Sequence, residues 1–203
     1  MRFRGSKAAG SFCCDKEGSF ELLVHCEADS TIHSYAEFNF GSVLSPHEAE
    51  LFGDIAAYFI RHAVGLFVIC VEPSTPRPTR RYRRLRSKAD ETLARRSIWL
   101  FTTTIEDLRR DPYWLNACEI ARCAQADLTY ADQSRIIDFL ALEGQAAIMD
   151  CARRCRSSLD SCDAVLRLVS SGILAIDADT PLTTASLVRL QSGAPSGSPL
   201  TWL

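Results

Sequence analysis

Two short apolar runs with a helix-compatible stretch between them place the strongest constraint on the fold of this chain. Residues 66–71 (LFVICV) lie between Gly65 and Pro73, and their β-branched, uniformly apolar character is typical of a strand buried on both faces. Residues 97–103 form a second run of this kind, and residues 79–96 between them are basic and helix-compatible. A strand, a helix and a second strand in this order predict parallel strands joined by a right-handed crossover, and therefore an α/β sheet.

Further elements are expected on the N-terminal side of these strands. Residues 17–26 fit a short helix that presents Glu17 and Glu21, four positions apart, on one side. Residues 32–43 alternate apolar and polar side chains well enough to predict a strand. Residues 47–62 stay open between helix and strand, because they begin with HEAE and later contain the extended-type run YFI.

The character of the chain changes after residue 124, where helix follows helix. Apolar spacing and helix terminators predict three helices, at residues 132–142, 146–155 and 160–171. Residues 173–177 and 186–190 then predict a small two-stranded wing. Three helices and a wing describe a winged-helix module.

These elements divide the chain into four parts. Residues 1–16 are expected to form a flexible lead-in, residues 17–124 an α/β domain, residues 125–190 a winged-helix-like domain and residues 191–203 a flexible tail. The expected fold class is therefore α/β, with a mixed sheet flanked by helices and followed by a small all-helical or winged-helix C-terminal module.

The composition excludes several classes of protein. With 203 residues, 47% of them hydrophobic and 24% charged, the chain can bury a sizeable core, which excludes fibrous and disordered classes. Its longest apolar stretch, residues 63–71, is nine residues long. That is about half of the roughly 18–20 that a membrane-spanning helix needs. No apolar segment of secretory length follows the basic start of the chain. We therefore expect a cytoplasmic protein without a membrane partner.

The nine cysteines are expected to be reduced thiols, because a chain of this length does not need disulfides and no secretion signal points to an oxidising compartment. The alternative is a metal site that uses Cys118 and Cys123, or Cys151, Cys155 and Cys162. Zinc ligands usually lie on turns, whereas these cysteines lie in helix-like stretches. Buried thiols are therefore the favoured interpretation, and no metal ligand is assigned.

The charge pattern points to an anionic partner. The net charge is −2, but residues 77–124 carry 12 basic and 6 acidic side chains, between two regions in which acids predominate. The seven cations concentrated at the start of this region are Arg77, Arg80, Arg81, Arg83, Arg84, Arg86 and Lys88. Closely spaced cations contact phosphates and release counterions, so we expect salt-dependent binding of double-stranded DNA. A solvated helix face and a surface for an acidic protein are the alternatives.

Three carboxylates are candidates for catalysis. Glu21 lies in the first expected helix, Asp54 precedes the central strand and Glu72 ends that strand. Carboxylates beside a central strand can hold Mg²⁺ for phosphodiester hydrolysis, where the ion lowers the pKa of its bound water and stabilises the leaving oxygen. The alternative for each of the three is a surface or helix-capping role.

Four segments stand in an order that resembles a known family. They are residues 17–23 (EGSFELL), residues 26–35 (CEADSTIHSY), residues 67–73 (FVICVEP) and residues 98–112 (IWLFTTTIEDLRRDP), with Asn116 after the last. Together they resemble the TnsA-type endonuclease subunits of heteromeric transposases, over roughly residues 10–190. The resemblance implies a restriction-endonuclease-like core of the PD-(D/E)XK type. It also implies two partners, an integrase-type transposase subunit and an ATPase regulator.

The chain departs from that family at the residues that would catalyse. The family uses a helix Glu, an Asp that opens a strand, and a Glu or Gln and a Lys on the central strand. Glu21 matches the first, whereas Tyr58, Cys70 and Glu72 stand at the other three places. A tyrosine and a neutral thiol cannot supply the hard anionic oxygens that Mg²⁺ prefers, and a glutamate cannot replace the positive charge of a lysine. An alternative register recruits Asp54 and Glu72 as ligands.

We therefore expect a TnsA-like protein of transposition, a form of DNA recombination, that binds DNA and transposase partners, has weak or no nuclease activity and needs no cofactor. One alternative is an active endonuclease that cuts transposon ends, with Mg²⁺ as its cofactor. Another is a winged-helix DNA-binding regulator. Residues 160–171 contain only Arg167 and two acids, which is poor chemistry for reading a DNA groove.

Overall fold

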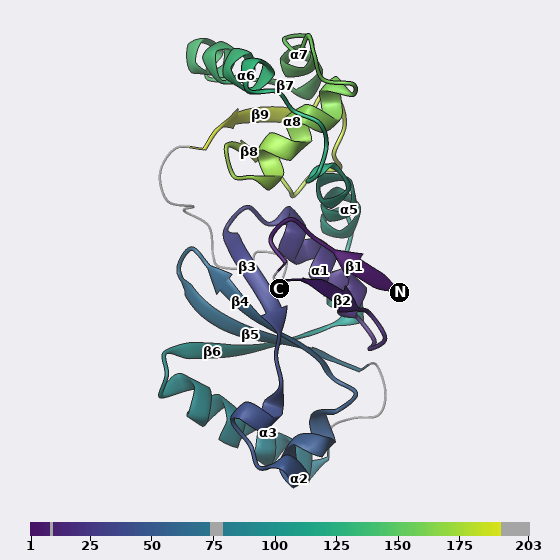
Figure 1. Cartoon of the computed structure of the whole chain (residues 1–203), viewed down its shortest axis with the longest axis vertical. Helices are drawn as coiled ribbons and strands as arrows, with labels where there is room; N and C mark the ends of the chain where they lie inside the picture. Colours follow the sequence, from purple (N-terminus) through teal and green to yellow (C-terminus); the bar gives the residue numbers. More distant parts are fainter. Residues whose placement is uncertain (9, 74–78, 192–203) are drawn as a thin grey trace. The chain divides into compact units, whose positions relative to one another are not determined.

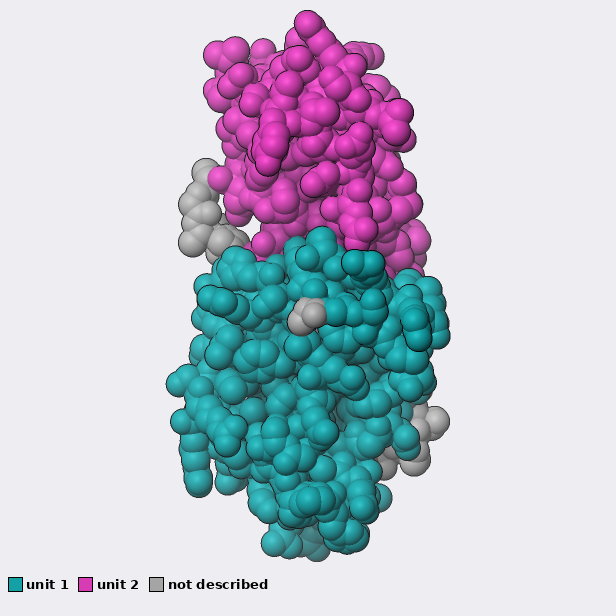
Figure 2. Space-filling view, viewed as in Figure 1, with its two compact units in different colours: residues 1–23, 32–109, 199–203 teal, residues 24–31, 110–198 magenta. Residues whose placement is uncertain are grey.

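The computed structural model describes residues 1–8, 10–73 and 79–191, which form two compact units (Figure 2). Within these residues, unit 1 comprises 1–23 and 32–109, and unit 2 comprises 24–31 and 110–191. The second unit thus begins at Arg110 and not at the expected residue 125, because Ile120 and Cys123 are buried in its core. It also takes in residues 24–31, where Ala28 packs against the same core. The sequence had not indicated that residues 24–31 belong to the second unit while the segments on either side of them belong to the first.

Unit 1 is built on a four-stranded mixed sheet flanked by helices, which confirms the predicted α/β class (Figure 1). Its elements, including the shared helix α1, are β1 (Arg2–Arg4), β2 (Ser11–Cys13), α1 (Ser19–Ala28), β3 (Ile32–Glu37), α2 (Pro46–Ala49), β4 (Ala56–His62), β5 (Gly65–Glu72), α3 (Arg80–Ala94), β6 (Ile98–Thr104) and α4 (Ile105–Leu108). The strand order is β3-β4-β5-β6; the first three are antiparallel neighbours, and β5 and β6 are parallel. The predicted strand–helix–strand unit is therefore present as β5, α3 and β6.

Helix α3 begins where Thr79 caps it, with the Thr79 side chain accepting a hydrogen bond from the backbone N–H of Tyr82 at 3.2 Å. Leu85, Ala89 and Leu93 recur at helical spacing and form its buried face. They pack in one cluster with side chains of β4 and β5, which fixes α3 against one face of the sheet. The opposite face of α3 is left to solvent.

Unit 1 differs from the sequence expectation in three places. The strand expected over residues 32–43 ends at Glu37, because the Asn39 side chain accepts a hydrogen bond from Gly41 and begins a 3-10 helix at Phe40–Ser42. The ambiguous residues 47–62 contain the C-terminal part of the short helix α2, a second 3-10 helix (Glu50–Phe52) and then strand β4. Residues 1–16, expected to form a flexible lead-in, contain the antiparallel pair β1 and β2.

Unit 2 combines helices with a three-stranded sheet. Besides its part of α1, its elements are α5 (Tyr113–Cys123), α6 (Tyr130–Glu143), β7 (Gln145–Ala147), α7 (Ile148–Ala152), α8 (Ser161–Ser170), β8 (Leu174–Ile176) and β9 (Leu187–Leu190). The expected pairing of the last two strands is present and antiparallel. A third strand, β7, pairs with β9 in the part expected to be helical, so the helix predicted at 146–155 is shortened to α7. No helix among the described residues is long and apolar enough to cross a membrane.

Gly18, which precedes α1, is required by both its backbone conformation and its close packing. Its φ of +72° lies in the left-handed region, and a Cβ there would lie 2.4 Å from Cγ1 of Val71, in the middle of the sheet. We expect Gly18→Ala to lower the free energy of unfolding by about 2 kcal/mol, from backbone strain and overpacking together. Chemical denaturation measures this loss. Gly144→Ala is the matched control, because Gly144 has a φ of +77° but no atom within 4 Å of the added Cβ; equal losses in both variants would contradict the packing account.

Candidate functional site

The outward face of α3 carries a row of arginines. Arg80, Arg83 and Arg84 are exposed, and they lie opposite the buried face that contains Leu85 and Ala89. In the described part of the chain, the side chains of these three arginines make no ion pair. Positions three and four apart on a helix are neighbours, so the three guanidinium groups lie on one side of α3. We call Arg80, Arg83 and Arg84 the arginine row.

The other basic residues of this stretch are engaged with the protein itself. A guanidinium nitrogen of Arg81 lies 3.3 Å from Nε2 of His47. Lys88 Nζ donates to both carboxylate oxygens of Glu48, at 2.7 and 2.9 Å. This contact and the hydrogen bonds from Ser45 lower the pKa of Glu48 to about 2. Arg81 and Lys88 are therefore already in contact with other side chains of the protein.

The sixth cation, Arg86, lies on α3 and binds the end of the central strand, β5. Its Nη1 donates to Oε1 of Glu72 at 3.0 Å, and its Nη2 donates to Oγ1 of Thr102 at 2.8 Å. Glu72 thus forms an ion pair with a residue of α3, on the face of the sheet that α3 covers. Arg77, the remaining predicted cation, lies outside the described residues.

Cys70 and Tyr58 lie on opposite faces of the sheet. Cys70 stands opposite Ala57 in the β4–β5 ladder and is buried in the cluster under α3. Burial raises the pKa of its thiol to about 12, so the thiol is protonated at neutral pH. Tyr58 stands opposite Ile69, one position further along the strand, and its ring contacts that of Phe12 with a centroid distance of 5.7 Å. Since successive side chains of a strand point to opposite faces, Tyr58 does not meet Cys70.

Glu21, the residue that matches the family's helix glutamate, is buried in α1 and bound by an arginine. Nε and Nη2 of Arg109 both donate to its Oε1, at 3.0 and 2.5 Å. Asp54 is exposed in the turn that precedes β4. Two of the three candidate carboxylates are therefore held in separate ion pairs, Glu21 with Arg109 and Glu72 with Arg86.

These arrangements do not build a metal site. Among the described residues, no three or more His, Cys, Asp and Glu side chains are placed so as to hold a metal ion. The contacts that neutralise the two glutamates join residues 88 and 14 positions apart. Sequence spacing therefore gave no signal for either pair, although Arg109 lies within one of the quoted motifs.

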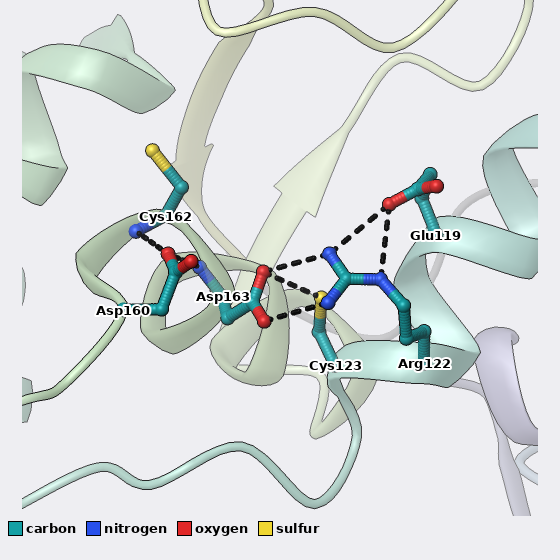
Figure 3. A network of polar contacts seen from close by, with 6 residues as sticks. All are labelled: Glu119, Arg122, Cys123, Asp160, Cys162 and Asp163. Carbon is teal, nitrogen blue, oxygen red and sulfur yellow. Dashed lines mark hydrogen bonds and ion pairs between the residues drawn. The ribbon is translucent and has the colours of Figure 1, made fainter.

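Cys123, one of the cysteines considered as alternative zinc ligands, has a carboxylate partner within unit 2. Cys123 is fully buried, and its Sγ donates to Oδ1 of Asp163 at 3.2 Å (Figure 3). Burial, followed by this contact, raises the pKa of Cys123 to about 12. Arg122 holds the same carboxylate through two hydrogen bonds of 2.8 Å and also contacts Glu119. This network ties α5 to α8 inside unit 2.

Helix α8 presents little charge to solvent. Most of its residues are buried in the core of unit 2, and its Asp163 is bound by Arg122. Its one basic side chain, Arg167, donates to the backbone carbonyl of Ala126 at 2.5 Å. The charged groups of this helix are therefore committed to contacts within the unit.

Asn116, the last residue of the motif at residues 98–116, is a structural anchor. Its side-chain amide donates to the carbonyls of Ala178 and Thr180 at 3.0 and 2.8 Å, and its Oδ1 accepts from the backbone N–H of Leu182 at 2.8 Å. The buried amide thereby fixes the connection between β8 and β9.

Comparison with known proteins leaves the family open. No family model matches the chain, and no curated protein matches its sequence at a significant level. The likeness to TnsA-type subunits therefore rests on the motifs alone.

Proposed function

We propose that this protein is a TnsA-like transposition subunit that binds double-stranded DNA through the arginine row of α3 and has no nuclease activity. The observation that carries the proposal is the contrast within unit 1. Arg80, Arg83 and Arg84 are exposed without an ion-pair partner in the described structure, whereas the glutamates Glu21 and Glu72 are neutralised by arginines.

The arrangement of unit 1 supports a restriction-endonuclease-like scaffold. Its core elements follow the order α1, β3, β4, β5, α3 and β6, and they form a mixed sheet flanked by helices. The resemblance to TnsA-type subunits places a catalytic glutamate in the first helix and two catalytic positions on the central strand. Glu21 lies on α1, and Cys70 and Glu72 lie on β5.

The arginine row suits a phosphate backbone. Guanidinium groups bind phosphate oxygens in a bidentate way, and each phosphate that is neutralised releases condensed counterions. Three arginines within two turns of one helix are better placed to contact neighbouring phosphates than to contact the edges of several bases. We therefore propose binding that is governed by charge, with little preference for sequence.

The donor set near β5 does not fit the Mg²⁺ that a nuclease of this family would use. Mg²⁺ requires several anionic or carbonyl oxygens in a tight octahedron. Cys70 offers a protonated thiol, Glu72 is paired with Arg86, and Tyr58 lies on the other face of the sheet. No observation on these residues favours the alternative of an active endonuclease.

The second unit supports a contact with protein partners. From α6 onward, its order of helix, strand, two helices and two strands, with the sheet order β7-β9-β8, is compatible with the winged-helix expectation. Its helix α8 is mostly buried, and Arg167 is used internally, so α8 offers little for reading a DNA groove. We propose that unit 2 contacts the integrase-type transposase subunit or the ATPase regulator that the family resemblance implies.

Fluorescence anisotropy with a labelled DNA duplex over a series of salt concentrations tests this function. We expect the logarithm of the binding constant to fall linearly with the logarithm of salt concentration, with a slope of about −2.7 or steeper for three or more phosphate contacts. Binding that is absent at low salt, or that does not respond to salt, would contradict the proposal.

A further inference from the structure

Strand β6 is an open edge of the sheet in unit 1. In the strand order β3-β4-β5-β6, the outer side of β6 pairs with no strand among the described residues (Figure 1). The other edge is protected, because Ala8 forms a parallel bridge with Tyr35 of β3, and Tyr35 N–H donates to the carbonyl of Lys7 at 3.4 Å. The β3 edge is therefore covered at Tyr35, whereas the β6 edge stays unpaired in the described structure.

The open edge lacks the devices that normally prevent association. The seven residues of β6, Ile98–Thr104, contain no charged residue and no proline. Natural edge strands usually carry lysine, proline or a bulge, because unpaired N–H and C=O groups bind any available strand. A long, uncharged edge of this kind favours pairing with another strand.

An exposed aromatic surface lies beside this edge. Trp99 and Phe101 are 50% and 36% exposed, and both rings contact Phe67 of β5, with centroid distances of 5.3 and 5.4 Å. Gly65 makes room for Trp99, since a Cβ at this glycine would lie 2.3 Å from the indole ring. The rings are therefore held in place by the sheet and form a preorganised apolar surface.

The charges on either side of β6 indicate which partner fits. Arg95 and Arg96 precede the strand, and Glu106 and Asp107 follow it. These pairs are nearly symmetric about Phe101, the central residue of β6. If two copies pair antiparallel with Phe101 opposite Phe101, the basic end of each strand faces the acidic end of the other. Opposite charges are then juxtaposed at both ends, and no like charges meet along the strand.

We propose that two copies of this protein associate through antiparallel pairing of their β6 strands, centred on Phe101. The two four-stranded sheets become one continuous sheet of eight strands, and Trp99 and Phe101 of both copies form one apolar surface. The interface is isologous, because the same strand serves both copies. The twofold axis is perpendicular to the sheet, so both α3 helices lie on the same side of it.

Sedimentation velocity of a charge-swapped pair of variants tests the pairing. We expect the wild-type protein to dimerise at micromolar to sub-millimolar concentrations. Arg96→Glu and Glu106→Arg are each expected to weaken self-association at least tenfold, because position 96 of each copy then faces a like charge at position 106 of the other. An equimolar mixture is expected to restore dimers, since in the heterodimer every end again meets an opposite charge. Asp107 is left in place because it caps α4 through the N–H of Thr104.

The same sedimentation experiment includes a control variant with a charge change elsewhere on the sheet. Arg61→Glu makes an equal change of charge to Arg96→Glu at an exposed arginine away from β6, and it is expected to leave the dimer constant unchanged. A monomeric wild type overturns the proposal, and so does a dimer that is insensitive to both swaps or a mixture that stays monomeric. The proposal does not rest on DNA binding, which is measured separately with the labelled duplex.

Discussion

Replacing Arg80, Arg83 and Arg84 together with alanine is expected to weaken the binding of duplex DNA by roughly 10²- to 10³-fold at about 0.1 M salt. Each of the three exposed guanidinium groups is assigned one phosphate contact, and each contact contributes about 0.9 to the salt slope. The slope is therefore expected to become shallower by about 2.7 in the triple variant. Because all three side chains point to solvent, the variant should fold normally. Fluorescence anisotropy over a salt series measures both quantities.

A second triple variant separates this local effect from a general loss of charge. Arg2→Ala/Arg61→Ala/Arg153→Ala removes three exposed arginines that lie outside α3. We expect it to retain most of the affinity and the wild-type salt slope. If both triple variants lose affinity equally, binding follows net charge, and the arginine row has no special role.

Asp132 is the residue whose replacement we expect to destabilise unit 2 most. It is fully buried at the start of α6, where it accepts backbone hydrogen bonds from Arg156, Ser157 and Ser158 at 2.8 to 3.1 Å. Its Oδ1 also accepts from Arg135 at 2.5 Å. Alanine would leave three backbone N–H groups and a guanidinium without their acceptor. We expect Asp132→Ala to lower the melting temperature by about 15 °C, measured by circular dichroism.

The pH dependence of this effect has a defined sign. The backbone N–H of Arg156, with the other donors, holds the pKa of Asp132 well below its usual range. A carboxylate with a depressed folded-state pKa stabilises the protein above its unfolded pKa of about 3.9, and this stabilisation is lost as the pH falls towards the folded pKa. The stability difference between wild type and Asp132→Ala should therefore narrow below about pH 4. The exposed Asp138, on the same helix, is the control, and its alanine variant should melt near the wild type.

The parts of the fold that the sequence predicted are those with a strong local signal. Strands β5 and β6 were predicted because their apolar runs are uninterrupted, and α3 because its basic stretch lies between prolines and a second strand. Thr104 caps α4 through a reciprocal capping box with Asp107, which is likewise a local pattern in the sequence. Strands of only three residues, such as β1 and β7, have too little periodicity to stand out from loops.

The candidate site was predicted less well, because its contacts are non-local. The basic composition of residues 77–88 was evident, but composition does not reveal which cations are already paired within the protein. The partners of Arg86 and Lys88 lie 14 and 40 positions away. The register of β4 against β5 was equally hidden. Because side chains alternate between faces, only the structure shows that Tyr58 and Cys70 point apart.

The most direct test of the central claim is incubation of the purified protein with supercoiled plasmid in the presence of Mg²⁺ or Mn²⁺. The claim is that unit 1 binds DNA without the oxygen ligands needed to cut it. We expect the plasmid to stay supercoiled with the wild type, with Glu21→Ala and with Glu72→Gln, while gel shifts show that the wild type binds it. Cleavage by the wild type that disappears in Glu21→Ala or Glu72→Gln would contradict the account.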